Sequence, residues 1–274
     1  MVRIDARTAF GDGRLGVIAG PCVAEDLALC LEVAGELERI AARLELPLVF
    51  KSSYAKENRS SATSYRGPGL EGGLAILGAV RERTGLSVLS DVHAPEEVAA
   101  AARVLDVLQI PAFLCRQTPL LLACGAAGKP VNVKKGQFVA PEDMIGAVEK
   151  LRGAGCPGIL LTERGATFGY HDLVVDMRSF TRMAFAGVVT VYDVTHSLQQ
   201  PGGPVTGGRR EFALPLGRAA VAAGAMAVFL EAHPEPARAR SDAATQLPLA
   251  QVEGLLAELK RVHAAVGPAA GVKR

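Results

Sequence analysis

One stretch of the sequence, residues 47–61, reads Pro-Leu-Val-Phe-Lys-Ser-Ser-Tyr-Ala-Lys-Glu-Asn-Arg-Ser-Ser. Its first four residues are apolar, and a short apolar run beside turn-forming residues is typical of a buried β-strand. Charged and hydroxyl side chains follow directly, beginning at Lys51. The stretch therefore predicts a buried strand that delivers polar groups at its carboxyl end.

The same pattern recurs along the chain and predicts its architecture. We expect strands at residues 16–20, 48–50, 87–91, 107–110, 131–134, 158–162, 188–193 and 227–231. Amphipathic stretches lie between them, notably at residues 27–44, 72–84, 141–152 and 209–223. Eight strand–helix units in about 250 residues predict an α/β protein with a single (β/α)8 TIM barrel as one domain over residues 1–274. A doubly wound open sheet is the alternative, but no Gly-x-Gly-x-x-Gly turn follows the first strand.

Composition narrows the classes of function. The 274 residues are 49% hydrophobic with a formal net charge of only +2, which argues against a nucleic-acid surface. Tryptophan is absent, so no platform for stacking bases is evident. No apolar run is long enough for a membrane span, and no signal peptide is recognisable at the start. Five scattered cysteines favour reduced thiols, and the cytoplasm is the expected compartment.

The barrel prediction places the chemistry at the carboxyl ends of the strands. These ends carry polar residues almost throughout, namely Cys22, Lys51, Asp91, His93, Gln109, Lys134, Lys135, Glu163, Arg164, Asp193, His196, Glu231 and His233. A single polar residue at a strand end is common. Because nearly every strand ends in one, the set indicates one composite active site.

The loop after the second strand has the donors that phosphate oxygens require. It supplies Lys51, Lys56, Asn58, Arg59 and Ser60, which combine charged groups with rotatable hydroxyls. The alternative is an ordinary solvated basic loop. We interpret the loop as a binding site for a phosphorylated molecule.

Four residues near the same rim could hold a metal ion. Cys22, His196, Glu231 and Asp242 offer one thiolate, one imidazole and two carboxylates, which suit Zn²⁺, Fe²⁺ or Mn²⁺. Cys22 could instead be a small buried residue, and His93 and His233 compete with His196 as ligands.

Three further features remain open at this point. Lys134 and Lys135 should point to opposite faces of their strand, so only one faces the barrel mouth. Residues 165–170 form a glycine-bounded loop that either approaches a ligand or is simply a turn. Residues 199–210, rich in glycine and proline, predict a mobile loop over the mouth or a disordered surface insertion.

A family resemblance rests on motifs that follow one another over essentially the whole chain. They are residues 18–22 (Ile-Ala-Gly-Pro-Cys), 50–61, 90–93 (Ser-Asp-Val-His), 109–114, 132–135 (Asn-Val-Lys-Lys), 163–166, 193–197 (Asp-Val-Thr-His-Ser) and 231–234, with Ser241-Asp242. The series resembles the 3-deoxy-D-manno-octulosonate 8-phosphate synthases. Membership would imply a (β/α)8 barrel, usually a cytoplasmic homotetramer, in the route to the Kdo sugar of lipopolysaccharide. It would also imply a transferase that condenses phosphoenolpyruvate with D-arabinose 5-phosphate and releases phosphate.

The resemblance also implies roles for individual residues. Cys, rather than Asn, after the Ala-Gly-Pro turn matches the metal-dependent branch, with Cys22, His196, Glu231 and Asp242 as ligands. Phosphoenolpyruvate would contact Lys134 and Arg164, with help from Lys51 and Lys56. Arg59 and Ser60 would hold the arabinose 5-phosphate, oriented by Asn58, and the remaining substrate-binding positions are Asp91, Gln109 and Gln199. Proton transfer would fall to His196, Asp242 or a lysine, Lys51 or Lys134, while the metal orients water or, alternatively, polarises the aldehyde.

Two rival functions fit the sequence less well. A 3-deoxy-D-arabino-heptulosonate 7-phosphate synthase would use erythrose 4-phosphate, but its family carries a different motif at residues 58–61. A non-catalytic phosphosugar-binding or scaffold protein would be expected to lack ligands or cations, and none is missing from the pattern.

Overall fold

The computed structural model describes residues 1–58, 63–201 and 206–267. Eight parallel strands pair in sequence order, from β3 to β8 and then β11 and β14. Pairing of β14 with both β3 and β11 closes the ring. The strands are β3 (Gly16–Gly20), β4 (Leu48–Lys51), β5 (Ser87–Asp91), β6 (Val107–Ile110), β7 (Val131–Lys134), β8 (Ile159–Glu163), β11 (Val189–Asp193) and β14 (Ala227–His233). The predicted (β/α)8 barrel is confirmed, and the closed ring rules out the open sheet.

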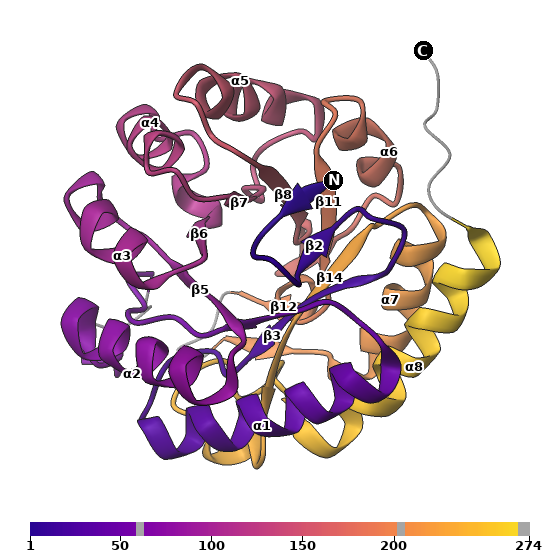
Figure 1. Ribbon diagram of the computed structural model, residues 1–274. Coiled ribbons are helices and arrows are strands. Elements are labelled where there is room, and N and C mark those ends of the chain that lie inside the picture. Colours follow the sequence, from indigo (N-terminus) through magenta and orange to yellow (C-terminus); the bar gives the residue numbers. More distant parts are fainter. Residues whose placement is uncertain (59–62, 202–205, 268–274) are drawn as a thin grey trace.

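A helix follows each barrel strand and packs on the outside of the ring (Figure 1). The helices are α1 (Leu27–Leu44), α2 (Gly69–Thr84), α3 (Val98–Val104), α4 (Thr118–Ala126), α5 (Ile145–Gly153), α6 (Arg178–Ala184), α7 (Ala213–Ala222) and α8 (Leu249–Val266). Several are preceded by a short 3-10 turn, as at Glu142–Met144 before α5 and Arg210–Phe212 before α7. These turns explain why the two helices begin later than the sequence pattern suggested.

Helix α1 shows how the sequence defines such an element. The Asp26 side chain accepts a hydrogen bond from the Leu29 amide and so caps the first turn. Cys30, Val33, Ala34, Leu37 and Ile40 recur at helical spacing and are all buried against the barrel. The helix ends at Glu45, whose left-handed backbone returns the chain to β4.

Inside the barrel, six of the eight strands change from apolar to polar over two residues. Because successive side chains alternate between faces, positions two apart point the same way. Val49 and Lys51, Leu89 and Asp91, Val107 and Gln109, Leu160 and Thr162, Val191 and Asp193, and Phe229 and Glu231 form such pairs. The first member of each pair belongs to one inner apolar cluster. The barrel interior is therefore hydrophobic in its lower half and polar toward its carboxyl end.

A hairpin closes the hydrophobic end. Strands β1 (Val2–Arg3) and β2 (Ala9–Phe10) pair antiparallel and lie across that end of the barrel (Figure 1). Val2 and Phe10 are buried in the inner cluster, and Phe10 packs directly on Gly16. A Cβ atom at Gly16 would lie 2.7 Å from the Phe10 ring, so this position requires glycine. The open end of the barrel is therefore the polar one.

Two loops have more regular structure than the sequence suggested. Residues 165–170, taken as a glycine-bounded loop, mostly form strand β9 (Ala166–Gly169), which pairs with β10 (Asp172–Val174). Within residues 199–210, β12 (Gln199–Gln200) pairs with β13 (Gly207–Gly208), so the prediction of an irregular loop is wrong at both of its ends. These short strands are recognised only by their backbone pairing, because so few residues show no clear periodicity in the sequence. Among the helices of the described residues, none has the length and apolar character needed to cross a membrane.

Candidate active site

A pocket of about 450 Å³ opens at the polar end of the barrel. Eight of the residues predicted from sequence line it, namely Lys51, Lys56, Asn58, Asp91, Gln109, Lys134, Arg164 and His196. They come from strand ends or from the loops that follow them, as the barrel prediction required. Arg59 and Ser60, predicted to hold a sugar phosphate, lie outside the described residues.

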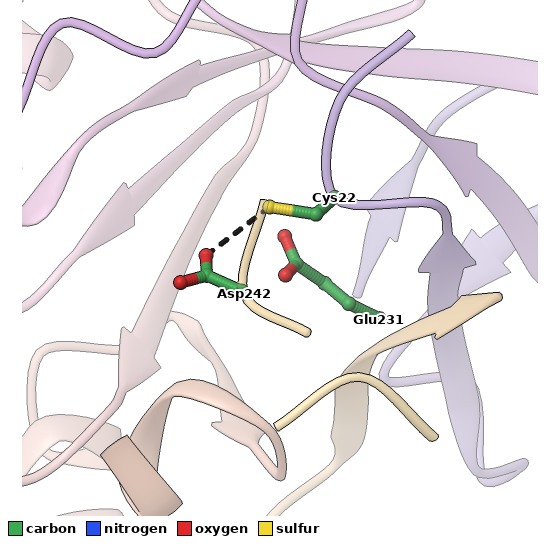
Figure 2. Close-up of side chains that lie close together, drawn as sticks. All are labelled: Cys22, Glu231 and Asp242. Carbon is green, nitrogen blue, oxygen red and sulfur yellow. Dashed lines mark hydrogen bonds between the residues drawn. The ribbon is translucent and has the colours of Figure 1, made fainter. Parts of the chain in front are cut away.

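Beside this pocket the structure brings together three of the four predicted metal ligands. One ligand atom each from Cys22, Glu231 and Asp242 lies within 4.8 Å of the other two. Figure 2 shows the three side chains converging, with the Cys22 thiol 3.1 Å from Asp242 Oδ2. Cys22 and Glu231 are fully buried.

His196, the fourth predicted ligand, lies next to this cluster but is not one of its three members. Its Nε2 lies 3.6 Å from Glu231 Oε1 and 3.9 Å from Asp242 Oδ2. Its Nδ1 is held 2.9 Å from Asp193 Oδ2. A carboxylate on one ring nitrogen orients the other nitrogen outward, as behind metal-binding histidines in general.

Backbone geometry fixes the cluster. The ends of β3 and β4 approach so closely that a Cβ atom on Gly20 would lie 2.0 Å from the Lys51 carbonyl oxygen, which explains glycine two residues before Cys22. Gln246 accepts a hydrogen bond from the Cys22 amide and donates one to the Ser241 carbonyl. Asp242 adopts a left-handed backbone, with φ of 49°, which non-glycine residues rarely do. Such conformations cluster at functional sites.

The chemistry of the cluster fits a divalent metal ion. Glu231 Oε2 is buried and has no hydrogen-bond partner among the described residues. An orphaned buried carboxylate oxygen is unfavourable, and a cation would satisfy it. Burial, together with Asp242 and Glu231, raises the pKa of the Cys22 thiol, so ligation would require its proton to leave. Although burial opposes it, His196, Lys51 and Lys56 hold the pKa of Glu231 well below its ordinary value. These three cationic neighbours therefore favour the ionised form of Glu231.

Two lysines surround Glu231. Lys51 Nζ lies 2.6 Å from Glu231 Oε1 and donates to the Cys22 carbonyl at 3.0 Å. Lys56 Nζ is 3.7 Å from the same oxygen. The Lys51 ammonium is therefore occupied by Glu231 and the Cys22 carbonyl. Lys56 lines the pocket, and its contact with Glu231 is longer, so an anion in the pocket can compete for its charge.

On the opposite side, Lys134 and Arg164 provide cations that face the pocket. Lys134 forms an ion pair with Asp193 and sits 3.3 Å above the centre of the Phe229 ring. Arg164 donates to Gln199, and its Nη1 is buried without a partner among the described residues. Gln199 in turn donates to Asp242 Oδ1 at 3.1 Å, which links Arg164 to the metal-binding cluster.

The neighbouring Lys135 is occupied elsewhere. Its Nζ donates to the carbonyl oxygens of Gly136 and Val139 and lies 3.5 Å from Glu163 Oε1. Of the two consecutive lysines, Lys134 lines the pocket and Lys135 holds the loop after β7 in place.

Two residues at the site were not assigned a substrate role from sequence: Asp193, which adjoins the pocket through Lys134, and His93. Asp193 pairs with Lys134 and with His196, and its place three residues before His196 was the available signal. His93 also lines the pocket; it was considered only as a metal ligand and lies outside the cluster, as does His233, whose Nδ1 accepts from the Glu235 amide. Nothing in the sequence distinguishes a pocket histidine from a ligand histidine at a strand end.

Comparison with known proteins agrees with this arrangement. Residues 1–266 match the DAHP synthetase I family. A 2-dehydro-3-deoxyphosphooctonate aldolase of Syntrophobacter fumaroxidans is 54% identical over 255 residues, which cover 92% of this chain and 88% of the relative. Proteins with the same name are 53% identical in Syntrophotalea carbinolica, over 94% of both chains, and in a Bradyrhizobium species, over 95% of this chain and 92% of the relative. The chain therefore belongs to the DAHP synthetase I family and, within it, to the 2-dehydro-3-deoxyphosphooctonate aldolases.

Proposed function

We propose that the protein condenses phosphoenolpyruvate with D-arabinose 5-phosphate and water, giving 3-deoxy-D-manno-octulosonate 8-phosphate and inorganic phosphate. The observation that carries the proposal is the unpartnered Nη1 of Arg164, a side chain that lines the pocket together with Lys134. A buried guanidinium nitrogen without an acceptor, within the part of the chain that the structure describes, is suited to an anionic ligand. The names of the relatives support the same reaction class.

In this proposal the two anionic substrates occupy opposite sides of the pocket. Arg164 and Lys134 bind phosphoenolpyruvate, with Lys51 and Lys56 adding positive charge near Glu231. The loop after β4 receives the sugar phosphate, where Asn58 lines the pocket and Arg59 and Ser60 follow. Asp91 and Gln109 lie between these groups and contact the substrates from the pocket floor. Separate cation groups prevent the two phosphates from exchanging places.

The bonds change in three steps. C3 of the enol attacks the aldehyde carbon as the C2=C3 double bond opens, and the aldehyde oxygen takes up a proton. Water adds at the electron-deficient C2 and gives up a proton. Phosphate then leaves by cleavage of the C2–O bond, while the new C2 hydroxyl loses its proton and becomes the carbonyl of the product. The residues placed to move protons are His196, between Asp193 and the acidic cluster, and Lys134, whose pKa burial lowers against the opposing charge of Asp193. Asp242 and Lys51 complete this set.

We also propose that Cys22, His196, Glu231 and Asp242 hold one divalent ion, Zn²⁺, Fe²⁺ or Mn²⁺. Mixed thiolate, imidazole and carboxylate ligands suit these three ions. When bound, the ion would supply a positive charge that orients and acidifies water. The orphaned Glu231 Oε2 and the position of His196 Nε2 support the assignment.

The test is phosphate release from phosphoenolpyruvate with either arabinose 5-phosphate or erythrose 4-phosphate, before and after chelation and metal add-back. Release with arabinose 5-phosphate alone, lost on chelation and restored by metal, is the expected result. Release with erythrose 4-phosphate alone would assign the heptulosonate reaction instead. Activity that survives thorough chelation would remove the metal from the proposal. No phosphate release with either sugar phosphate would favour a binding or scaffold role.

The proposal extends to the assembly and its compartment. Residues 1–274 would act as one barrel domain, in the cytoplasm, as part of a homotetramer. Free thiols at all five cysteines support a reducing compartment. Exposed aromatic residues at the pocket end, Phe113, Phe138 and Phe168, support a subunit interface, because such side chains are enriched where proteins associate. Light scattering of the purified protein tests the tetramer.

A further inference from the structure

A row of four hydrogen-bonded side chains runs beneath the pocket. Asp91, Gln109, Asn132 and Thr162 come from the consecutive strands β5, β6, β7 and β8. Asp91 is in register with Gln109, and Gln109 with Asn132. Thr162 lies two residues beyond Leu160, the register partner of Asn132, and so shares its face. All four side chains are buried.

The bonds of the row are short and continuous. Thr162 Oγ1 donates to Asn132 Oδ1, Asn132 Nδ2 donates to Gln109 Oε1, and Gln109 Nε2 donates to Asp91 Oδ1, each at 2.7 Å. Ser53 Oγ donates to the other oxygen of Asp91 at 2.6 Å.

The two ends of the row determine its direction. An ionised carboxylate only accepts hydrogen bonds, whereas a hydroxyl can donate. Burial alone would raise the pKa of Asp91, but Lys51 and Lys56 outweigh it and hold the pKa below its ordinary value. Asp91 therefore accepts at one end, and Thr162 donates at the other. Turning the Gln109 amide over would set its oxygen against Asp91 and its nitrogen against Asn132 Nδ2, and both bonds would be lost.

Only one half of the row reaches the ligand space. Asp91 and Gln109 line the pocket, whereas Asn132 and Thr162 do not. We propose that Asn132 and Thr162 are positioning residues, which fix the orientation of the Gln109 amide and thereby the face that Gln109 and Asp91 present to substrate. The effect on turnover rests on the proposed function; the effect on the Gln109 amide does not.

Two substitutions at one position separate orientation from packing. Thr162→Val keeps the shape of the side chain and removes the hydroxyl, whereas Thr162→Ser keeps the hydroxyl and removes a methyl group. We expect Thr162→Val to lower kcat/KM about tenfold, of the order of one lost orienting hydrogen bond, while Thr162→Ser retains near wild-type kcat/KM with a lower Tm. A merely structural role would make kcat/KM follow Tm in both variants and would overturn the proposal.

The matched control is Thr190→Val on the next strand. Thr190 is also buried, but its hydroxyl bonds the Gly224 carbonyl, away from the pocket. The same chemical change there should affect Tm without changing kcat/KM.

A double-mutant cycle tests whether Thr162 acts through Gln109. In a Gln109→Leu background, Thr162→Val should cause little further loss, because the amide that it orients is gone. A tenfold loss that persists undiminished in this background would overturn the proposal.

A spectroscopic readout keeps the test independent of the reaction. In protein labelled with ¹⁵N at glutamine side chains, the amide signal absent from the Gln109→Leu variant belongs to Gln109. We expect its protons to exchange faster with water in Thr162→Val than in wild type or Thr162→Ser. Unchanged exchange in Thr162→Val would overturn the inference. If wild-type protein releases no phosphate from the two substrates, the proposed function fails, and the amide signal still decides the role of Thr162.

Discussion

The Lys51 ammonium lies 2.6 Å from Glu231 Oε1, and neither side chain is exposed to solvent. Sequence reasoning treated Lys51 as a cation for a substrate phosphate, because it begins the polar loop after β4. The structure shows that its main partner is a candidate metal ligand. Lys51 lines the pocket, but its ammonium holds Glu231 in place and balances the charge of that carboxylate.

This pair predicts a stability loss. Lys51→Met would leave the Glu231 carboxylate buried without its nearest cation, and we expect a loss of about 3–5 kcal/mol in the free energy of unfolding. Urea unfolding in the presence of a chelator measures it. Lys260→Met is the matched control, because Lys260 pairs with Glu45 on the surface, where such a pair contributes about 1 kcal/mol or less. Equal losses in the two variants would contradict the prediction.

The cysteine cluster predicts a loss of metal. Cys22→Ser removes the only thiolate from the set and should weaken metal affinity about tenfold or more, with a parallel loss of activity. Cys30→Ser, a buried cysteine of α1 outside the cluster, should retain its metal. Elemental analysis after dialysis measures the content. A Cys22→Ser protein that is metal-free and fully active would refute a role for the ion.

Arg164 predicts a loss of substrate affinity. Arg164→Lys keeps the charge but not the planar fork that donates to Gln199 and leaves Nη1 free for a ligand. We expect the KM for phosphoenolpyruvate to rise about tenfold, as for loss of a charge-assisted hydrogen bond. Arg152→Lys is the control, because the Arg152 side chain donates to the Ala186 carbonyl and does not line the pocket. An unchanged KM in Arg164→Lys would exclude Arg164 from that binding site.

Asp91 predicts a dependence of stability on pH. Lys51 and Lys56 overcome the effect of burial and lower the pKa of Asp91 in the folded protein. A lowered pKa stabilises the folded state above the pKa of the unfolded chain, about 3.9, and this stabilisation disappears as the pH falls below that value. The difference in unfolding free energy between wild type and Asp91→Asn should therefore be largest near neutral pH and shrink below about pH 4. Urea unfolding from pH 7 to pH 3 checks it, and a difference independent of pH would contradict it.

Most of the barrel could be predicted from sequence because its strands are buried on both faces. Runs such as Val107–Ile110 and Val131–Lys134 are short, buried at every position and rich in branched apolar residues, and the sequence pattern locates them to the residue. The short ladders β1–β2, β9–β10 and β12–β13 could not be predicted, since two to four residues show no period.

The sequence predicts which residues line the site, but it predicts less well which side chains these residues pair with. Strand-end positions identified Lys51 and Lys134, but whether an ammonium faces a ligand or a buried carboxylate depends on side chains from distant strands. Glu231 is 180 residues from Lys51, and Asp193 is 59 residues from Lys134. Asn132 illustrates the same limit, because a buried amide in a strand acquires its role only from Gln109 and Thr162 on either side.

The β1–β2 hairpin, which buries Val2 and Phe10 in the hydrophobic end of the barrel, has a consequence for the order of folding. Phe10 precedes every barrel strand in the sequence, yet it packs in a cluster with Ala227 and Phe229 from the last barrel strand. The first hairpin therefore cannot reach its final environment until the ring has closed around it. Because the chain contains no tryptophan, a Phe10→Trp substitution would introduce a single tryptophan, whose fluorescence on transfer from water marks that closure.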